Sequence, residues 1–215
     1  MLAGLARFCP DRSSSAAARV ATVLGMSTPT KTVLHDDDIL TVHDFCGPDE
    51  CAELIRLAQG IGFEAAPITT FSGFVMAPEV RNNTRVILDD EERARRLWQR
   101  LAPFVPERPR WRAIGLNERF RFYRYEPGQY FRWHRDGAYR RDLREQSLLT
   151  FMIYLDADFA GGSTDFDPDG EVVRVTPARG MALLFDHPIR HQGAPVVRGV
   201  KHVLRSDIMY RREPV

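Results

Sequence analysis

The chain has 215 residues, of which 44% are hydrophobic and 27% are charged, and its formal net charge is +1. A near-neutral charge provides no general attraction to nucleic acid or to an anionic membrane surface. No run of about eighteen apolar residues predicts a membrane span. Its three cysteines are too few, and odd in number, for a secreted disulfide framework. The length suits one globular domain with a sizeable core.

The first 30 residues differ in composition from the rest of the sequence. The stretch MLAGLARFCPDRSSSAAARVATVLG contains three arginines, three serines and one acidic residue. This composition is typical of an organellar transit peptide, and equally of an unstructured tail before a start at Met26. We therefore expect residues 1–30 to be a disordered tail or targeting segment and residues 31–215 to form one domain. The expected location is cytoplasmic, or organellar if residues 1–25 are a transit peptide.

The first predicted elements are one strand and two helices. ILTVHDF (39–45) alternates apolar and polar residues as a strand does. GPDECAELIRLAQG (47–60) has proline near its start, glycine at its end and apolar residues at helical spacing. Residues 89–102 begin with four acidic residues and continue with arginines, an order that matches the helix dipole. Both segments are therefore predicted to be helices with one buried face.

Strand patterns replace the helical period after Trp111. NERFRFYRY (117–125) alternates, with Phe120 and Phe122 on one face and Tyr123 and Tyr125 on the other. SLLTFMIYLD (147–156) is almost continuously apolar, as in a strand that is covered on both faces. Further strands are predicted in the stretches 171–175, 180–186 and 203–210. Helices followed by many short strands predict an α+β chain whose second half is a sandwich or barrel, for which a jelly roll is one solution.

Arginine is concentrated in the middle of the chain. Between Arg93 and Arg144 there are fifteen arginines and five acidic residues, a surplus of ten positive charges. One interpretation is a solvated surface, and the other is a binding surface for an anionic partner or substrate. The sequence pattern leaves both open.

The stretch WHRDG (133–137) contains two good metal ligands, His134 and Asp136. On an extended strand, residues i and i+2 point to the same side, so both could bind one cation, although a polar pair on a surface strand has the same pattern. A third ligand could be His187 or His191, both in FDHPIRHQGAP. Two histidines and one carboxylate favour Fe(II) in oxygen chemistry, and they also suit zinc.

Lysine is rare, because the chain has 28 arginines and only Lys31 and Lys201 as lysines. A lysine where arginine is the usual cation suggests a need for its compact charge. Lys201 follows His191 by ten residues, enough for one strand to end and the next to return towards the same cavity. The alternative is an exposed lysine in a GVKH turn.

Four segments together carry a family resemblance: YEPGQYFRWHRDG, GGSTDF, ARGMALLFDH and HQGAPVVRGVKHVLRSDIMYR. They resemble the 2-oxoglutarate- and Fe(II)-dependent dioxygenases, in the branch of the prolyl 4-hydroxylase catalytic subunits. The similarity covers roughly residues 39–212. It implies a double-stranded β-helix, which is a jelly roll, with N-terminal helices supporting its major sheet.

The resemblance also assigns roles to residues of this chain. It implies that His134, Asp136 and His191 are the metal ligands of the catalytic centre. It implies that Lys201 and Tyr125 bind the C5 carboxylate of 2-oxoglutarate. Arg205 and Asp207 share strand parity with Lys201, so Arg205 is expected either to support the cosubstrate or to form an ion pair with Asp207. His187 is expected either to contact a metal ligand from the side away from the metal or to face the substrate. The alternative is that it only stabilises the fold.

The implied chemistry requires Fe(II), 2-oxoglutarate and O₂, with ascorbate as an expected stimulant. 2-Oxoglutarate is decarboxylated to succinate and CO₂ while the substrate is hydroxylated. The substrate is expected to be a protein or peptide residue or a small molecule, with no membrane or nucleic-acid partner. The alternatives are an AlkB-type nucleic-acid demethylase and a non-catalytic metal-binding jelly roll.

A loop before one predicted strand bears on the substrate. PEVRNNTRV contains Arg81, Asn82, Asn83 and Arg85, which are expected either to form a lid or substrate contact or to fix the loop through hydrogen bonds. RNNTR departs from the corresponding segment of collagen-type prolyl hydroxylases, which argues against a collagen-like substrate.

Overall fold

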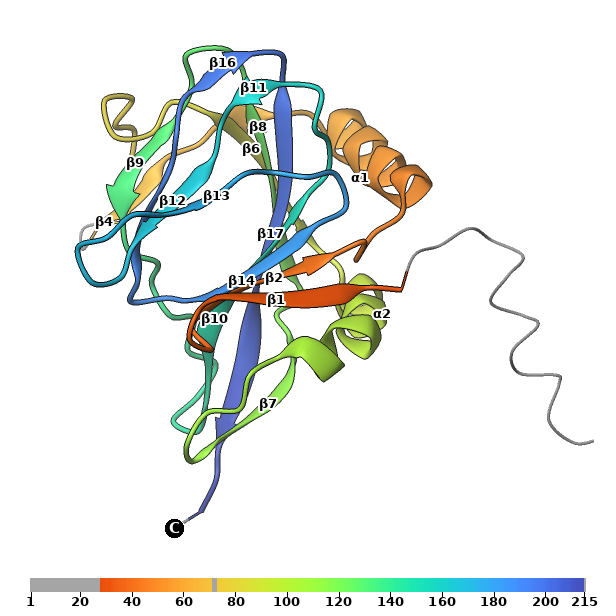
Figure 1. Ribbon diagram of the computed structural model, residues 1–215, viewed down its shortest axis with the longest axis vertical. Helices are drawn as coiled ribbons and strands as arrows, with labels where there is room; N and C mark the ends of the chain where they lie inside the picture. Colours follow the sequence, from red (N-terminus) through yellow and green to blue (C-terminus); the bar gives the residue numbers. More distant parts are fainter. Residues whose placement is uncertain (1–27, 71–72, 215) are drawn as a thin grey trace, which may run out of the picture.

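The computed structural model describes residues 28–70 and 73–214, which form mostly β-strands together with two α-helices (Figure 1). The expected tail or targeting segment falls almost entirely on residues 1–27, which lie outside the described residues. The first strand already begins at Thr30. Neither α-helix of the described part is long and apolar enough to cross a membrane.

Nine antiparallel strands form the major sheet. In sheet order, eight of them are β1 (Thr30–His35), β2 (Ile39–His43), β14 (Ala182–Asp186), β10 (Glu145–Tyr154), β17 (Lys201–Arg212), β8 (Arg119–Tyr125), β6 (Thr84–Asp89) and β3 (Glu64–Ala65). The ninth, β7 (Trp111–Leu116), pairs with the C-terminal half of β17. The long strand β17 therefore lies at the centre of the sheet, where it pairs with β10, β8 and β7.

Four shorter strands form the minor sheet, in the order β13 (Val173–Val175), β12 (Thr164–Asp167), β15 (Arg190–Gly193) and β9 (Phe131–His134). Two small two-stranded sheets pair β11 (Ala160–Gly161) with β16 (Val196–Arg198), and β4 (Ile68–Thr70) with β5 (Gly73–Val75). One buried apolar cluster joins Phe166 and Val175 of the minor sheet to Leu183 and Phe185 of the major sheet. The two sheets thus face each other across a shared core, as in a jelly roll.

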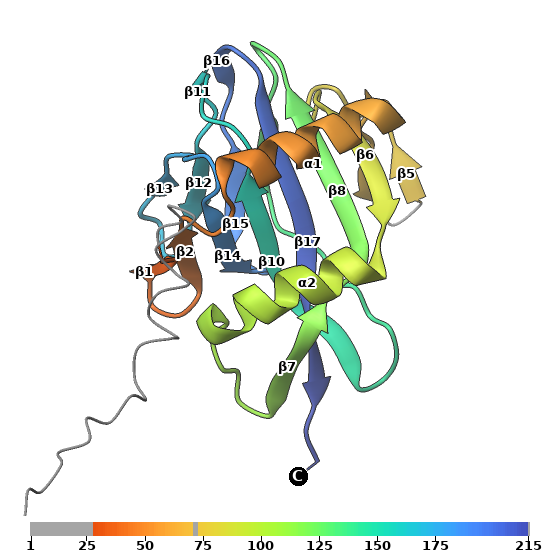
Figure 2. The same ribbon diagram turned by 90° about the vertical axis from the view of Figure 1, so that its right-hand side faces the viewer.

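Both helices lie across the other face of the major sheet (Figure 2). They are α1 (Pro48–Ile61) and α2 (Glu91–Leu101), the latter continued by the short 3₁₀ helix η2 (Ala102–Phe104). The predicted apolar faces are buried, with Leu54 and Leu97 in one cluster together with Phe120 and Phe122 of β8. The predicted helices at 47–60 and 89–102 are therefore present, with boundaries shifted by one or two residues.

The parity predicted for β8 is also present. Phe120 and Phe122 face the helices, whereas Tyr123 and Tyr125 belong to the cluster between the sheets. This orientation turns Tyr125 towards the interior, and the register of β8 with β17 places it directly opposite Lys201. Alternation along one strand therefore brings two of the predicted site residues together.

Candidate active site

Strand register brings the two predicted histidine ligands together. His134 at the end of β9 pairs directly with His191 of β15, and their ring centroids are 4.2 Å apart. The Asp136 carboxylate lies 3.7 Å from the Nε2 atom of each histidine. One ligand atom from each of the three residues can be chosen so that all lie within 4.8 Å of one another. The side chains proposed as a metal triad therefore converge at one point.

Asp136 is not on the same strand as His134, which differs from the expected extended pair. Strand β9 ends at His134, and the backbone N–H of Asp136 instead donates to the carbonyl of His187 (3.1 Å). This bond ties the loop after β9 to the loop after β14. The carboxylate reaches the histidines because of this loop contact and not because of strand alternation.

Both histidines present Nε2 to the site. The Nδ1 atom of His134 is 2.7 Å from the carbonyl of Arg132, and that of His191 is 3.0 Å from the carbonyl of Ile189. A carbonyl can only accept, so each Nδ1 carries the hydrogen and each Nε2 has a free lone pair. Backbone partners of this kind are typical of metal-binding histidines.

Burial keeps both imidazoles neutral. Burial and the neighbouring His191 lower the pKa of His134 to about 3, and burial lowers the pKa of His191. Burial alone would raise the pKa of Asp136, but Arg205 and the two histidines outweigh it and hold that pKa below its ordinary value. All three residues are therefore in the protonation state that binds a metal. Two imidazole nitrogens and one carboxylate fit a divalent transition metal such as Fe(II).

Lys201 is a buried lysine that has no carboxylate partner among the described residues. Only 3% of the residue is exposed, and its Nζ donates to the carbonyl of Gly162 (2.6 Å). Nζ also lies over the rings of Tyr125 and Tyr154, 5.4 and 5.3 Å from their centroids. Within the described residues no acidic side chain lies at ion-pair distance from it, and burial lowers the pKa of Lys201 to about 7. A buried cation of this kind fits an anionic ligand.

One cavity joins Lys201 to the histidines and Asp136. Its polar lining includes His134, Asp136, His191 and Lys201, and Phe131 and Met152 are among its apolar walls. The Phe131 ring stacks on His134, with centroids 3.5 Å apart. A cation at one place in the cavity and a candidate metal site at another suit a small molecule with two acidic groups.

Arg205 lies at the metal-ligand end of this cavity. Its Nη2 is 3.1 Å from Asp136 Oδ2 and 3.3 Å from Asp207 Oδ1. The ion pair between Arg205 and Asp207 that the sequence suggested is therefore present. The part in cosubstrate binding that was expected of Arg205 stays a prediction.

Arg81, expected in a lid or a fixed loop, is buried beneath the site. Its guanidinium stacks over Tyr123 and Phe131, with centroid distances of 4.4 and 4.5 Å. Its Nε donates to Asn83 Oδ1 (2.7 Å). These contacts fix the loop and support the ring of Phe131, so they agree with the hydrogen-bonding interpretation.

Sequence reasoning missed Thr150, which contacts the metal-ligand carboxylate. Its hydroxyl donates to Asp136 Oδ2 (2.6 Å) from the middle of β10. A signal was present, since Thr150 is polar within the apolar run SLLTFMIYLD. A buried polar side chain needs a hydrogen-bond partner, so a threonine in an otherwise apolar strand predicts a polar neighbour.

Comparison with known proteins shows which family this chain resembles. The model of the 2OG-Fe(II) oxygenase superfamily matches residues 120–206, a segment that contains the two histidines, Asp136, Tyr125, Lys201 and Arg205. Over this segment, which is less than half of the chain, the sequence is similar to the 2OG-Fe(II) oxygenase superfamily. The cofactors that the family implies are Fe(II) and 2-oxoglutarate, and both fit the donors described above.

Proteins similar to this chain include prolyl hydroxylases. Prolyl 4-hydroxylase 1 of Arabidopsis thaliana is 26% identical over 186 residues, which cover 76% of this chain and 65% of that protein. The chain thus spans just under two thirds of the length of this curated relative. The prolyl 4-hydroxylase-like resemblance seen in the sequence is confirmed.

Solved structures show the same fold. A prolyl hydroxylase from Trichoplax adhaerens, in complex with a hypoxia inducible factor peptide fragment, has a TM-score of 0.61 and 18% identity, with 84% of this chain and 86% of that chain covered. The viral collagen prolyl hydroxylase of Paramecium Bursaria Chlorella virus-1, as a 2OG complex, has a TM-score of 0.55 and 20% identity, with coverages of 84% and 99%.

The low pKa of Lys201 predicts how 2-oxoglutarate binding depends on pH. An anion prefers the charged lysine, whose population falls about tenfold per pH unit once pH rises above a pKa of about 7. The Kd for 2-oxoglutarate should therefore be flat below pH 7 and rise between pH 7.5 and 8.5. Lys201→Arg should remove this rise because arginine stays charged. Titration calorimetry at several pH values measures the Kd for 2-oxoglutarate. A Kd of the native protein that stays constant from pH 6.5 to 8.5 would contradict this prediction.

Proposed function

We propose that this protein is a 2-oxoglutarate- and Fe(II)-dependent hydroxylase that releases succinate and CO₂. One observation carries the proposal: neutral His134 and His191, ionised Asp136 and buried Lys201 line a single cavity. A pure binding protein would have no need for a metal-ligand triad together with a buried lysine that has no acidic partner among the described residues. We also infer that the two facing sheets are the double-stranded β-helix of the family, with α1 and α2 as its supporting helices.

Each part of the site has a proposed role. His134, Asp136 and His191 would hold Fe(II), and Lys201 with Tyr125 would bind the distal carboxylate of 2-oxoglutarate. Bound iron and 2-oxoglutarate supply the activation of O₂ that side chains alone cannot provide. The protein orients the carboxylates, and the apolar walls around Phe131 and Met152 limit the access of water.

A peptide containing proline is the first substrate class to test, because the relatives named above are prolyl hydroxylases. The arginine surplus between residues 93 and 144 gives little support to a nucleic-acid substrate. Ten of those fifteen arginines form ion pairs with acidic side chains within the described residues. Much of the positive charge is therefore neutralised locally, which agrees with the interpretation as a solvated surface.

Succinate release tests the proposed reaction. Purified protein is incubated with Fe(II), 2-oxoglutarate, ascorbate and O₂, with proline-containing peptides or single-stranded nucleic acid added separately. We expect peptide-stimulated succinate, and peptide product heavier by one oxygen atom in the mass spectrum. The matched control is His134→Ala. Succinate no higher than in this control with every substrate would refute the proposal, and stimulation by nucleic acid alone would refute the peptide assignment.

A further inference from the structure

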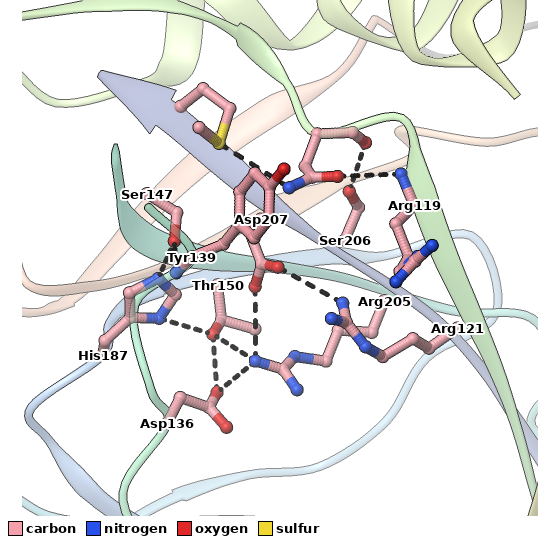
Figure 3. Close-up of polar contacts among 12 residues, drawn as sticks. Arg119, Arg121, Asp136, Tyr139, Ser147, Thr150, His187, Arg205, Ser206 and Asp207 are labelled. Carbon is pink, nitrogen blue, oxygen red and sulfur yellow. Dashed lines mark hydrogen bonds and ion pairs between the residues drawn. The ribbon is translucent and has the colours of Figure 1, made fainter. Parts of the chain in front are cut away.

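A chain of hydrogen bonds connects the backbone of Tyr139 to the carboxylate of Asp136 (Figure 3). Tyr139 N–H donates to Ser147 Oγ (2.8 Å), and Ser147 Oγ lies 2.9 Å from His187 Nε2. His187 Nδ1 lies 3.1 Å from Thr150 Oγ1, which donates to Asp136 Oδ2 (2.6 Å). The three side chains between the ends are buried, and His187 is only 3% exposed.

The chemistry of the groups gives this chain one direction. The Asp136 carboxylate can only accept, so the Thr150 hydroxyl hydrogen points to it and Thr150 Oγ1 must accept from His187 Nδ1–H. Burial lowers the pKa of His187, so the ring is neutral and its Nε2 accepts the hydroxyl hydrogen of Ser147. Ser147 in turn accepts from the backbone N–H of Tyr139. The donors and acceptors along the chain are therefore in a fixed order, and Thr150 Oγ1 accepts a further, longer bond from Arg205 Nη2 (3.4 Å).

His187 also holds Asp136 through the backbone. Its carbonyl accepts from Asp136 N–H (3.1 Å), and its own N–H donates to the carbonyl of Leu148 (3.0 Å). His187 thus holds Asp136 at two places. It binds the main chain of Asp136 directly, and it reaches the carboxylate Oδ2 through Thr150. With Oδ2 engaged by Thr150 and Arg205, Oδ1 is the less occupied oxygen.

We propose that His187 is a positioning residue, which acts through Thr150 to orient the Asp136 carboxylate for the metal. The inference rests on the proposed function, because it presumes a metal at the triad. It also separates the two histidines that the sequence offered as a third ligand. His187 has both ring nitrogens in hydrogen bonds, whereas Nε2 of His191 makes no hydrogen bond within the described part of the chain and faces Asp136 at 3.7 Å.

Two pairs of variants at neighbouring positions test this role. The amide nitrogen of His187→Asn lies near the Nδ1 position and can still donate to Thr150, whereas His187→Gln places its amide near the Nε2 position. Thr150→Ser keeps the hydroxyl, and Thr150→Val removes it with little change of shape. The measured quantities are the Kd for Co(II), as a spectroscopic substitute for Fe(II), and the visible spectrum of the bound Co(II), without 2-oxoglutarate or O₂.

We expect His187→Gln and Thr150→Val each to weaken Co(II) binding by about 10- to 100-fold, the usual effect of removing a partner behind a metal ligand. His187→Asn and Thr150→Ser should recover most of the affinity and the native spectrum. Because both residues act through one hydrogen-bond chain, the double variant His187→Gln/Thr150→Val should lose little more than the weaker-binding single variant.

The possible outcomes are distinct. Native affinity and spectrum in both His187→Gln and Thr150→Val would overturn the positioning role and leave the proposed function intact. Equal losses in His187→Asn and His187→Gln would indicate a packing effect and would also overturn it. If the native protein binds no Co(II) while its fold is intact, the proposed function fails together with this inference.

Discussion

Asp136→Ala is expected to lose metal binding and turnover together. The carboxylate is the only acidic group of the candidate triad, and its Oδ atoms lie 3.7 Å from both histidine Nε2 atoms. Without it, two neutral imidazoles remain to hold a dication. Removing a residue that only hydrogen-bonds a metal ligand lowers metal affinity by about 10- to 100-fold. Removing the ligand Asp136 itself should lower metal affinity by more than this. Succinate release should fall to background even at saturating 2-oxoglutarate.

Asp89→Ala is the matched control for this substitution. Asp89 also pairs with an arginine, Arg119 (2.8 Å), but both side chains are about half exposed. An exposed pair contributes about 0–1 kcal/mol, so metal affinity and turnover should be unchanged. Native metal affinity in Asp136→Ala, measured by titration of Fe(II) under anaerobic conditions, would contradict the triad.

Arg205→Met should destabilise the metal-free protein much more than the metal-loaded protein. Arg205 lies between two buried carboxylates, 3.1 Å from Asp136 and 3.3 Å from Asp207. Its removal leaves the negative charges of both carboxylates without this neighbouring positive charge. Breaking a buried ion pair in this way lowers the free energy of unfolding by about 3–5 kcal/mol. A bound dication would balance the negative charge of Asp136 in place of Arg205. The expected loss in Tm for the metal-free protein is about 6–20 °C, at about 2–4 °C per kcal/mol for a chain of this size.

Thermal unfolding with and without Co(II) measures this difference. Arg119→Met is the control, because it removes an arginine from the exposed pair with Asp89 and should shift Tm little in either state. An equal loss of Tm in Arg205→Met with and without metal would show that Arg205 does not balance the ligand carboxylate. Its contribution to stability would then come from its other contacts, which include Asp207 and Thr150.

Patterns within single segments predicted much of the fold. The apolar faces of α1 and α2 and the alternation of β8 were visible because burial on one face leaves a periodic trace. Strand β1 (Thr30–His35) was missed for the opposite reason. It is exposed over nearly its whole length, so its sequence carries no buried face, although it pairs with β2 at the edge of the major sheet.

The site could be predicted only in part, because its geometry depends on contacts between segments. Strand register, which sets His134 opposite His191, is not encoded by either strand alone. The same holds for Asp136, which reaches the histidines through a backbone bond to His187 beyond the end of β9. Family resemblance supplied the identity of the ligands, but the hydrogen-bond chain through Thr150 and His187 required the structure.

The most direct test of the proposed site is the visible spectrum of the anaerobic protein with Fe(II) and 2-oxoglutarate. The native protein should show the weak absorption band of an Fe(II)–2-oxoglutarate complex, saturating as 2-oxoglutarate is added. Lys201→Ala should reach the same band only at about 10- to 100-fold higher 2-oxoglutarate, because a charged hydrogen bond to the ligand is lost. His134→Ala should show no band. Absence of the band from correctly folded native protein at saturating 2-oxoglutarate would contradict the assignment of this cavity.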